Sequence, residues 1–367
     1  MLKAYKYRIY PNKEQKIQIA KTFGCCRFVY NQTLAYRKDT YENEKKSVSK
    51  TDCNNYCNRE LKKEYEWLKD VDKFALTNAI YNMDAAYRKF FKEHAGYPKF
   101  KSKRDNHKSY TTNYTNENIV VDFEKGRVKL PKLKMVKAKP PREFEGQIKS
   151  ATISQMPSGK YFVSILVEEE QVELPKVEKS VGIDLGIKDL VITSDGEKID
   201  NLKLIKKYEN KLVRQQRKLA HKQKGSKNRE KQRIKVAKIY EKIANTRNDY
   251  LHKISHKLIN ENQVIVSEDL SVSNMVKNAN LAKSISDCGW SELTRQLQYK
   301  ADWYGRTYVK IGRFVPSSQT CHVCGYKNEE TKDLTVRKWT CPQCQTEHDR
   351  DINAAINIQN EGLKQIA

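Results

Sequence analysis

The sequence predicts a multidomain α+β protein, in which a small β-barrel with an inserted helical module is followed by an α/β domain that carries a zinc ribbon. Three observations support this prediction. A strand-like run at residues 2–10 is separated by a long helical stretch from a series of short alternating runs. The segment after about residue 180 mixes apolar strands with strongly basic helices. Two Cys-x-x-Cys pairs stand near the C-terminus.

The composition indicates a partner with many negative charges. The chain has 367 residues, with 71 Lys and Arg against 45 Asp and Glu, so its formal net charge is +26. An excess of this size favours a polyanion such as a nucleic acid. A membrane partner is disfavoured, because no apolar run reaches transmembrane length and the chain opens with an alternating strand in place of a signal peptide. We therefore expect a cytoplasmic protein that is associated with the nucleoid.

The N-terminal segment predicts one strand and then a helical domain. Residues 2–10 alternate in the strand sense until Pro11 ends the run. The helical domain is expected at 11–95, with helical spacing over about 13–37, 50–65 and 73–93. The aromatic stripe of the third helix favours a core face, but the start of this helix could contact nucleic acid. The candidate contacts are Lys73, Phe74, Thr77 and Asn78.

The next segment, at 96–175, predicts a small β-barrel, because short alternating runs recur at regular intervals between turns. Since one strand precedes the helices, the helical domain is expected to be inserted into this barrel after its first strand, at 1–10. The run YPKFKSKR alternates basic and aromatic side chains, so it is either a solvated loop or a loop that grips phosphates. Its candidate contacts are Tyr97, Lys99, Lys101, Lys103 and Arg104.

The second half of the chain begins with a strand that carries an isolated aspartate. In SVGIDLGIKDL, Asp184 shares one strand face with Gly182 and Gly186. We expect these glycines to leave room for a metal ion and a phosphodiester backbone to approach the carboxylate. The region at 202–260 is strongly basic and helical, and it is either a solvated hairpin or a pair of helices that lines a polyanion channel.

Two more carboxylates lie at the ends of later elements. In the strand QVIVSEDL, Glu268 shares its face with the apolar residues, whereas Asp269 points to the other side. The last segment, at 348–367, predicts a helix with two alanines that allow close packing and with Asp351 in its first turn.

The segment at 317–347 predicts a structural zinc ribbon. Sixteen residues separate its two Cys-x-x-Cys pairs, which is the spacing of a ribbon with two knuckles. Disulfides are the alternative, and they are disfavoured because nothing in the sequence indicates secretion. A four-thiolate site has no open position, so a catalytic zinc is disfavoured. We expect the loss of zinc to unfold the ribbon without altering the carboxylates directly. The ligands are Cys321, Cys324, Cys341 and Cys344, and the other cysteines, Cys25, Cys26, Cys53, Cys57 and Cys288, are expected to be buried thiols.

Together, Asp184, Glu268 and Asp351 predict a metal-dependent nuclease. Hydrolysis of a phosphodiester needs acidic ligands that hold two divalent cations, here expected to be Mg²⁺, about 4 Å apart. In this chain order, the three residues indicate the RNase H-like RuvC nuclease core. Arg337, between the cysteine pairs, is either positioned to stabilise charge on the scissile phosphate at this cleft or a solvated arginine of the hairpin.

The motifs GIDLGIKDL, SEDL, RFVPSSQTC and DRDINAAINI, together with RIYPNKEQ and YPKFKSKR, resemble the TnpB/OrfB family. This family comprises insertion-sequence-encoded, RNA-guided DNA endonucleases related to type V CRISPR effectors, and the similarity covers nearly the whole chain. Gln319 stands where lysine is frequent in the family, which affects a peripheral contact. The resemblance implies that the catalytic positions are Asp184, Glu268 and Asp351, and not the neighbouring Asp269 or Asp349.

The resemblance also implies how the chain is divided and what it binds. An OB-like wedge β-barrel would comprise 1–10 and 96–175, with the recognition domain at 11–95. A RuvC domain at 180–316 and 348–367 would be interrupted by a zinc-bearing target-nucleic-acid-binding insertion at 317–347. The implied partners are a guide RNA derived from the transposon end and double-stranded DNA with a short adjacent motif, bound by a monomer on the RNA.

Two other functions stay open. A DNA-binding regulator could use the same scaffold without cutting, but such relatives have lost acidic residues and all three are present here. An RNase H-like transposase would also use three carboxylates, but the resemblance along the whole chain argues against it.

Overall fold

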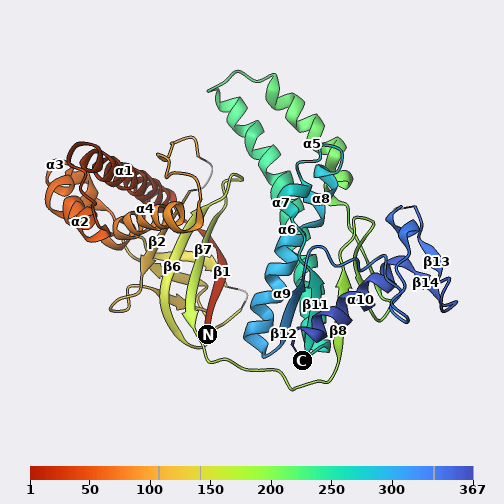
Figure 1. Ribbon diagram of the computed structural model, residues 1–367. Coiled ribbons are helices and arrows are strands. Elements are labelled where there is room, and N and C mark those ends of the chain that lie inside the picture. Colours follow the sequence, from red (N-terminus) through yellow and green to blue (C-terminus); the bar gives the residue numbers. More distant parts are fainter. Residues whose placement is uncertain (106–107, 141, 334, 367) are drawn as a thin grey trace. The chain divides into compact units, whose positions relative to one another are not determined.

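The structure, a computed structural model, describes residues 1–105, 108–140, 142–333 and 335–366 (Figure 1). The chain forms two compact units, Met1–Glu170 and Gln171–Ala367. Each unit is built around a β-sheet with its own hydrophobic core. Within the described residues, no helix is both long and apolar enough to cross a lipid bilayer.

The first unit begins with strand β1 (Leu2–Tyr10) and then enters the helical module. Its longest helix, α1 (Lys13–Glu44), starts after Asn12, whose side chain accepts a hydrogen bond from the backbone N–H of Gln15, while the Gln15 side chain accepts one from the N–H of Asn12. This reciprocal cap satisfies two backbone donors and fixes where the helix begins. The other helical elements are α2 (Lys50–Tyr56), η1 (Cys57–Leu61), α3 (Lys62–Glu64), η2 (Glu66–Asp70) and α4 (Lys73–Glu93).

A seven-stranded antiparallel sheet completes the first unit, in the order β2-β6-β7-β1-β5-β4-β3. The helices are inserted between β1 and β2, as predicted, and β1 lies inside the sheet between β7 and β5. Among the described residues no pairing joins β2 to β3, so the strands form an open sheet where the sequence predicted a barrel. Its later strands are β2 (Lys108–Asn113), β3 (Val120–Asp122), β4 (Arg127–Leu130), β5 (Lys134–Lys139), β6 (Gln147–Gln155) and β7 (Tyr161–Glu168).

One cluster of buried apolar side chains joins the helices of the first unit to its sheet. The cluster includes Ile19 of α1, Ile80 of α4 and Ile165 of β7, each 0% exposed. The helical insertion therefore shares a core with the strands that flank it in sequence. The cysteines outside the ribbon are buried and free, as expected, and four of them belong to this core: Cys25, Cys26, Cys53 and Cys57.

The second unit is built on a five-stranded sheet in the order β10-β9-β8-β11-β12. The first three strands form an antiparallel meander, and β11 and β12 then add parallel to β8. The strands are β8 (Ser180–Asp184), β9 (Asp189–Thr193), β10 (Lys198–Asp200), β11 (Val264–Glu268) and β12 (Thr307–Ile311).

The basic region forms two long helices, α5 (Leu204–Ala220) and α6 (Lys227–Glu261). A small apolar cluster between them, which includes Leu212 and Val236, holds the pair together. The turn contains Gly225 at a φ of +86°, a left-handed conformation that favours glycine. The remaining elements are α7 (Val272–Met275), α8 (Ala282–Cys288), α9 (Trp290–Tyr304), η3 (Glu329–Lys332), β13 (Lys338–Thr340), β14 (Glu347–Asp349) and α10 (Arg350–Lys364).

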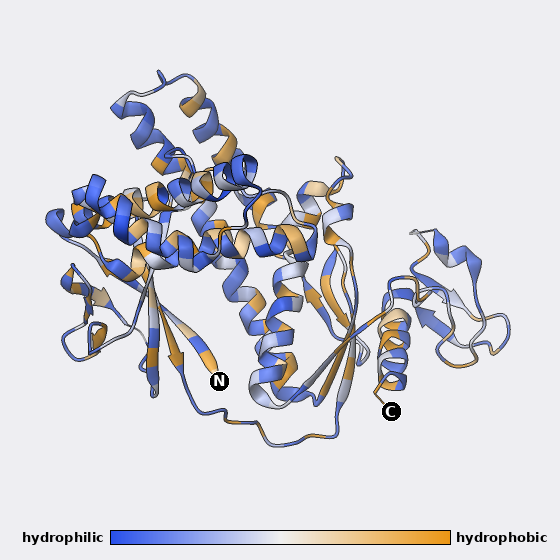
Figure 2. Ribbon diagram, turned by 60° about the vertical axis from the view of Figure 1, so that its left-hand side comes forward, coloured by the Kyte–Doolittle hydropathy of each residue, from blue (hydrophilic) through white to orange (hydrophobic). Residues whose placement is uncertain are grey.

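Helices cover both faces of this sheet. Ile183 belongs to a buried cluster with residues of α6 and α9, whereas Val266 packs with Ile358 of α10 on the other face. Figure 2 shows hydrophobic residues along the strands, as a sheet covered on both faces requires. The sheet is thus the middle layer between α6 and α9 on one side and α10 on the other.

Helix α10 lies very close to the sheet. A Cβ atom on Gly182 of β8 would overlap the carbonyl oxygen of Ala355 and would lie 2.6 Å from the backbone nitrogen of Gln359. A Cβ atom on Gly362 would overlap the side chain of Val266 in β11. Glycine at both positions lets the helix backbone contact the strands directly.

This packing changes the interpretation of the two glycines that flank Asp184. The prediction that they leave room for a metal ion and a phosphodiester is wrong. The α10 backbone fills the space beside Gly182, and a Cβ atom on Gly186 would lie 2.6 Å from the carbonyl oxygen of Asp189. Both glycines serve the packing of the protein itself.

We expect Gly182→Ala to lower the free energy of unfolding of the second unit by about 1–3 kcal/mol, because the added methyl group must displace the α10 backbone. Gly312→Ala is the matched control, since its Cβ atom would meet only Cγ2 of Val315 at 3.8 Å. Urea unfolding of the full chain measures both. Equal stability of Gly182→Ala and the wild type would contradict the close packing of α10.

Candidate active site

Asp184 and Glu268 come from neighbouring parallel strands. Strand β8 ends at Asp184 and strand β11 ends at Glu268. The register pairs Ile183 with Ser267, so the next residue of each strand lies at the same edge of the sheet. Because side chains alternate along a strand, both carboxylates are on the face that α10 covers.

Asp351 reaches this edge from the first turn of α10. The residue before the helix, Asp349, caps it by accepting hydrogen bonds from the N–H groups of Asp351 and Ile352 at 3.1 and 3.2 Å. Its carboxylate also accepts a hydrogen bond from Nζ of Lys198 at 2.7 Å. Burial alone would raise the pKa of Asp349, but these hydrogen bonds hold it below its ordinary value. Asp349 is thus a helix cap.

The three carboxylates interact electrostatically. Burial, and after it the negative charges of Glu268 and Asp351, raise the pKa of Asp184 to about 7. The backbone N–H of Leu185 and the positive charge of Arg350 act in the opposite direction. A carboxylate in this setting gains from a nearby cation, because the cation offsets both the burial and the like charges.

Arg337 lies at the same site. Its Nη1 atom is 3.3 Å from both carboxylate oxygens of Asp351. Its carbonyl oxygen accepts a hydrogen bond from the backbone N–H of Arg350 at 2.9 Å, which anchors this part of the ribbon to α10. Asp269, in contrast, is paired with Arg313 at 2.6 Å.

A cleft of about 480 Å³ opens beside Glu268. One face of α9 lines it, with Trp290, Arg295 and Tyr299 among the lining residues. The guanidinium carbon of Arg295 lies 5.3 Å from the ring centroid of Tyr299, which gives this wall a basic and aromatic character.

The four cysteines of the ribbon converge. Their sulfur atoms all lie within 4.8 Å of one another, and within the described residues no other group of Cys, His, Asp and Glu does so. The sulfur atoms of Cys321 and Cys344 are 3.6 Å apart, and those of Cys324 and Cys341 are 3.5 Å apart. A tetrahedral zinc ion with bonds of about 2.3 Å would place them about 3.8 Å apart, whereas a disulfide bond is about 2.05 Å long. The geometry fits a metal ion and not two disulfides.

A polar network that the sequence analysis missed surrounds this cluster. Nε2 of His348 lies 3.1 Å from the sulfur of Cys321. The Asn353 side chain donates a hydrogen bond to the carbonyl oxygen of Thr320 at 2.8 Å and accepts one from the backbone N–H of His322 at 3.1 Å. The available signal was a pair of asparagines four residues apart on one face of the expected helix, Asn353 and Asn357.

The loop before the first cysteine also contacts a carboxylate. The hydroxyl of Ser317 donates a hydrogen bond to Oε1 of Glu268 at 2.7 Å. With Arg337 beside Asp351, the predicted ribbon segment thus contacts two of the three carboxylates directly. These two contacts argue against the expectation that loss of zinc would leave the carboxylates unaltered.

The candidate contacts at the start of α4 have unequal environments. The side chain of Asn78 donates a hydrogen bond to the carbonyl oxygen of Thr111 at 2.9 Å, so it ties α4 to β2. Lys73 is exposed, and its Nζ lies 5.0 Å from the ring centroid of the half-buried Phe74. Thr77 is half-buried and bonds within its own helix. Lys73 is therefore the most accessible of the four.

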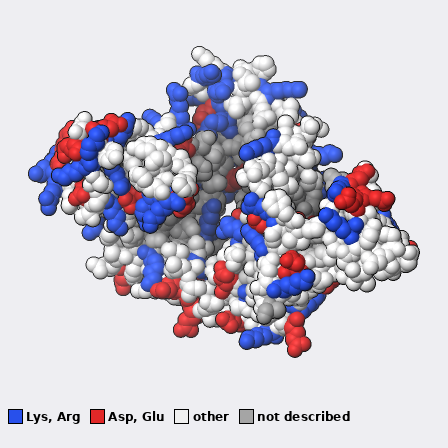
Figure 3. Space-filling model, viewed as in Figure 1, with Lys and Arg blue, Asp and Glu red and all other residues white. Residues whose placement is uncertain are grey.

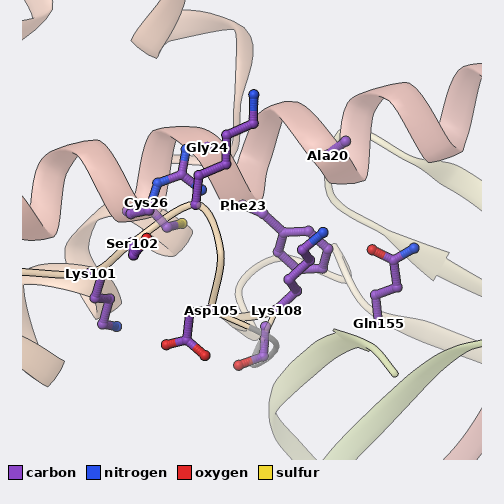
Figure 4. A pocket seen from close by; sticks show the side chains of 12 residues that line it. Ala20, Phe23, Gly24, Cys26, Lys101, Ser102, Asp105, Lys108 and Gln155 are labelled. Atoms are coloured by element: carbon purple, nitrogen blue, oxygen red, sulfur yellow. The ribbon is translucent and has the colours of Figure 1, made fainter. Parts of the chain in front are cut away.

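The loop at 96–104 is held against α1. The side chain of Asn31 binds both the N–H and the carbonyl of Lys101, at 2.8 and 3.0 Å, and Nζ of Lys101 lies 4.2 Å from the ring centroid of Tyr30. Figure 4 shows Lys101 lining a cavity of about 220 Å³. The Tyr97 hydroxyl is bonded to that of Tyr87, while the remaining basic residues are exposed: Lys99, Lys103 and Arg104.

The raised pKa of Asp184 predicts that stability depends on pH when Mg²⁺ is omitted. Because its folded-state pKa of about 7 exceeds the ordinary aspartate value of about 3.9, the folded chain retains a proton that the unfolded chain releases, and stability falls as the pH rises through this window. Asp184→Asn removes this loss. Its stability advantage over the wild type should be larger at pH 8 than at pH 5.5, by about 1–2 kcal/mol.

Urea unfolding at the two pH values measures this difference. Asp269→Asn is the control, because that carboxylate is paired with Arg313. The same advantage for Asp184→Asn at both pH values would show that the charges of the site do not act on Asp184.

Three family models match the chain. Residues 164–279 match the OrfB_IS605 model, described as "Probable transposase", and residues 290–358 match the Cas12f1-like TNB domain. Residues 1–46 match the HTH_OrfB_IS605 model, described as a helix-turn-helix domain. In the structure, the described elements within that range are one strand and one long helix, β1 and α1.

A solved structure shares the fold. The cryo-EM structure of the Cas12f1-sgRNA-target DNA complex contains a chain with a TM-score of 0.63 and 14% sequence identity, and the match covers 98% of this chain and 99% of that one.

Relatives match over nearly the whole chain. The "Putative RNA-guided DNA endonuclease" of Streptomyces pristinaespiralis is 39% identical over 98% of this chain and 89% of its own length. The "Putative RNA-guided DNA endonuclease InsQ" of Escherichia coli (strain K12) is 32% identical over 98% of this chain and 92% of its own length. On the strength of this identity along the whole length, the chain belongs to the TnpB/OrfB family.

Proposed function

We propose that this protein is an RNA-guided DNA endonuclease encoded by a transposable element. The relatives from Streptomyces pristinaespiralis and Escherichia coli carry this activity in their names. The observation that carries the proposal is the convergence of Asp184, Glu268 and Asp351 at one edge of the sheet. A regulator that binds without cutting would have no need of this costly cluster of like charges.

The three carboxylates are proposed to hold two Mg²⁺ ions. Mg²⁺ takes oxygen ligands at about 2.1 Å, so two ligands of one ion lie at most about 4.2 Å apart. Among groups of three or more such side chains in the described residues, only the four cysteines bring all their ligand atoms within 4.8 Å of one another, so the three carboxylates are not gathered around one point. When bound, two such ions activate a water molecule and stabilise the leaving oxygen of a phosphodiester.

The protein's own part in this reaction is to supply position and charge. Strands β8 and β11 and helix α10 hold the carboxylates on packed elements, so little reorganisation is needed during the reaction. The Arg337 guanidinium, 3.3 Å from Asp351, is proposed to stabilise negative charge on the scissile phosphate. Its anchoring to α10 keeps it beside the carboxylates.

The other segments are proposed to hold nucleic acid. The wedge would comprise 1–10 and 96–175, the recognition domain 11–95, the RuvC domain 180–316 and 348–367, and the target-binding insertion 317–347. Pairing between a guide RNA and one DNA strand would supply sequence recognition, while a monomer of the protein reads a short adjacent motif in the duplex. Figure 3 shows Lys and Arg side chains over both units, including the α5–α6 hairpin, as contacts with phosphates require.

The ribbon is proposed to hold one structural zinc ion through its four cysteines. We expect elemental analysis of the full-length protein to give about one zinc per chain, and Cys341→Ser to lose it. Because Ser317 and Arg337 link the ribbon to the carboxylates, we expect this variant to lose DNA cleavage as well. Cys288→Ser, at a buried cysteine outside the ribbon, is the control. Full cleavage by a zinc-free protein would contradict the coupling.

We expect Asp184→Ala, Glu268→Ala and Asp351→Ala each to reduce cleavage of target DNA by at least a thousandfold while binding of guide RNA and DNA stays near that of the wild type, because each removes a metal ligand and not an affinity contact. Asp269→Ala is the control. Single-turnover cleavage and filter binding with Mg²⁺ measure the two quantities. A variant that still cuts at the wild-type rate would show that the substituted residue is not needed for cleavage.

The same assay on Arg337→Ala distinguishes the two roles considered for Arg337, namely stabilisation of the scissile phosphate and a solvated position on the hairpin. A residue that stabilises the scissile phosphate lowers the cleavage rate by about 10- to 1,000-fold with little change in binding. An arginine that serves only the surface of the hairpin leaves both unchanged.

A further inference from the structure

We propose that Ser317 is a positioning residue for Glu268, whose hydroxyl holds one carboxylate oxygen so that the other is directed to the metal site. The inference rests on the proposed nuclease function, because it takes Glu268 as a metal ligand. Ser317 itself touches neither metal nor substrate in this proposal and acts through Glu268 alone.

The geometry of the contact supports this role. The Ser317 side chain is buried, with 5% of the residue exposed, and its Oγ lies 2.7 Å from Oε1 of Glu268. A hydrogen bond to a carboxylate is charge-assisted and stronger than a neutral one. Within the described residues, the Glu268 side chain makes no other hydrogen bond or ion pair. Its Oε2 atom is therefore free to bind a cation while Oε1 is held.

A glutamate at the end of a strand needs such support. Its long side chain loses up to about 2 kcal/mol of rotamer entropy when it is fixed. Asp184 and Asp351 have shorter side chains on packed elements and need less. Partners of this kind orient metal ligands, and their removal costs about 10- to 100-fold in metal affinity or activity.

Ser317 is itself fixed from α10. Its carbonyl oxygen accepts a hydrogen bond from the side chain of Asn357 at 2.8 Å, and the same amide donates to the carbonyl of Thr320 at 2.6 Å. Helix α10 also carries Asp351 in its first turn. One helix therefore sets two carboxylates, Asp351 directly and Glu268 through the loop.

The same loop leads into the first zinc knuckle. One turn before Asn357, Asn353 holds Thr320 and the N–H of His322, which lies between Cys321 and Cys324. The two asparagines thus hold both ends of the segment from Ser317 to His322 by hydrogen bonds. The proposed zinc ribbon thus lies next to the carboxylates and helps to fix the loop that orients Glu268.

Threonine and valine provide a matched pair for the test. Their side chains have nearly the same shape, but valine has a methyl group where threonine has its hydroxyl. Mn²⁺ is the probe, and its binding to the full-length protein is followed by electron paramagnetic resonance. We expect Ser317→Val to raise the Mn²⁺ dissociation constant by about 10-fold or more relative to Ser317→Thr. Ser317→Ala, which adds no atoms, should behave like the valine variant.

Cleavage of target DNA by the complex with guide RNA provides a second readout. The Mg²⁺ concentration that gives half the maximal rate should rise in Ser317→Val and Ser317→Ala but not in Ser317→Thr, and excess Mg²⁺ should recover much of the rate. Ser318→Ala is the control, because Ser318 makes no hydrogen bond among the described residues. All variants should keep about one zinc per chain.

Equal Mn²⁺ binding by the threonine and valine variants would overturn the proposal, and so would loss of zinc in Ser317→Ala, which would make Ser317 a structural residue of the ribbon. The two readouts separate this proposal from the function. If the wild type binds Mn²⁺ with the expected contrast but cuts no DNA, Ser317 keeps its role and the endonuclease proposal fails. If the wild type cuts DNA and the contrast is absent, only the role of Ser317 fails.

Discussion

The close approach of α10 to β8 is the constraint on which the second unit depends. A helix and a sheet usually meet through side chains on both elements, but here the helix backbone contacts Gly182 directly. Ala354 and Ala355, at 2% and 0% exposure, add almost no thickness to the contact. This approach brings Asp351 within electrostatic reach of Asp184, and any larger residue at position 182 would move one carboxylate away from the other.

The site concentrates negative charge, and the surrounding structure offsets only part of it. Asp351 lies in the first turn of a helix, where the positive end of the helix dipole favours a carboxylate. Arg337 lies beside it, and Ser317 donates to Glu268. These contacts leave Asp184 with its pKa at about 7, so near neutral pH either a bound proton or a metal cation would offset the remaining negative charge. Electrostatic repulsion is thus concentrated at the point where the proposed metal ions would relieve it.

The sequence predicted the elements of this site better than their contacts. Strand alternation separated Glu268 from Asp269, and cysteine spacing predicted the four-sulfur cluster, because both depend on local periodicity. The role of Gly182 could not be inferred in this way, since it depends on which helix covers that face of the strand. The bond from Ser317 to Glu268 joins residues 49 positions apart, and no local pattern encodes it. Whether the first sheet closes is likewise a matter of pairing between distant strands.

The position of β1 has a consequence for how the protein is made. Of the strands in this sheet β1 is made first, yet its partners are β7 and β5, with Leu2 opposite Glu168. At about 5–20 residues per second, synthesis reaches the end of β7 roughly 10 to 30 s after β1. Until β5 is made both edges of β1 are unpaired, and one edge stays unpaired until β7 is made, while the helices that follow β1 can already fold through local contacts. The inserted helices therefore delay sheet formation, and during this delay β1 is exposed to wrong pairing with other chains.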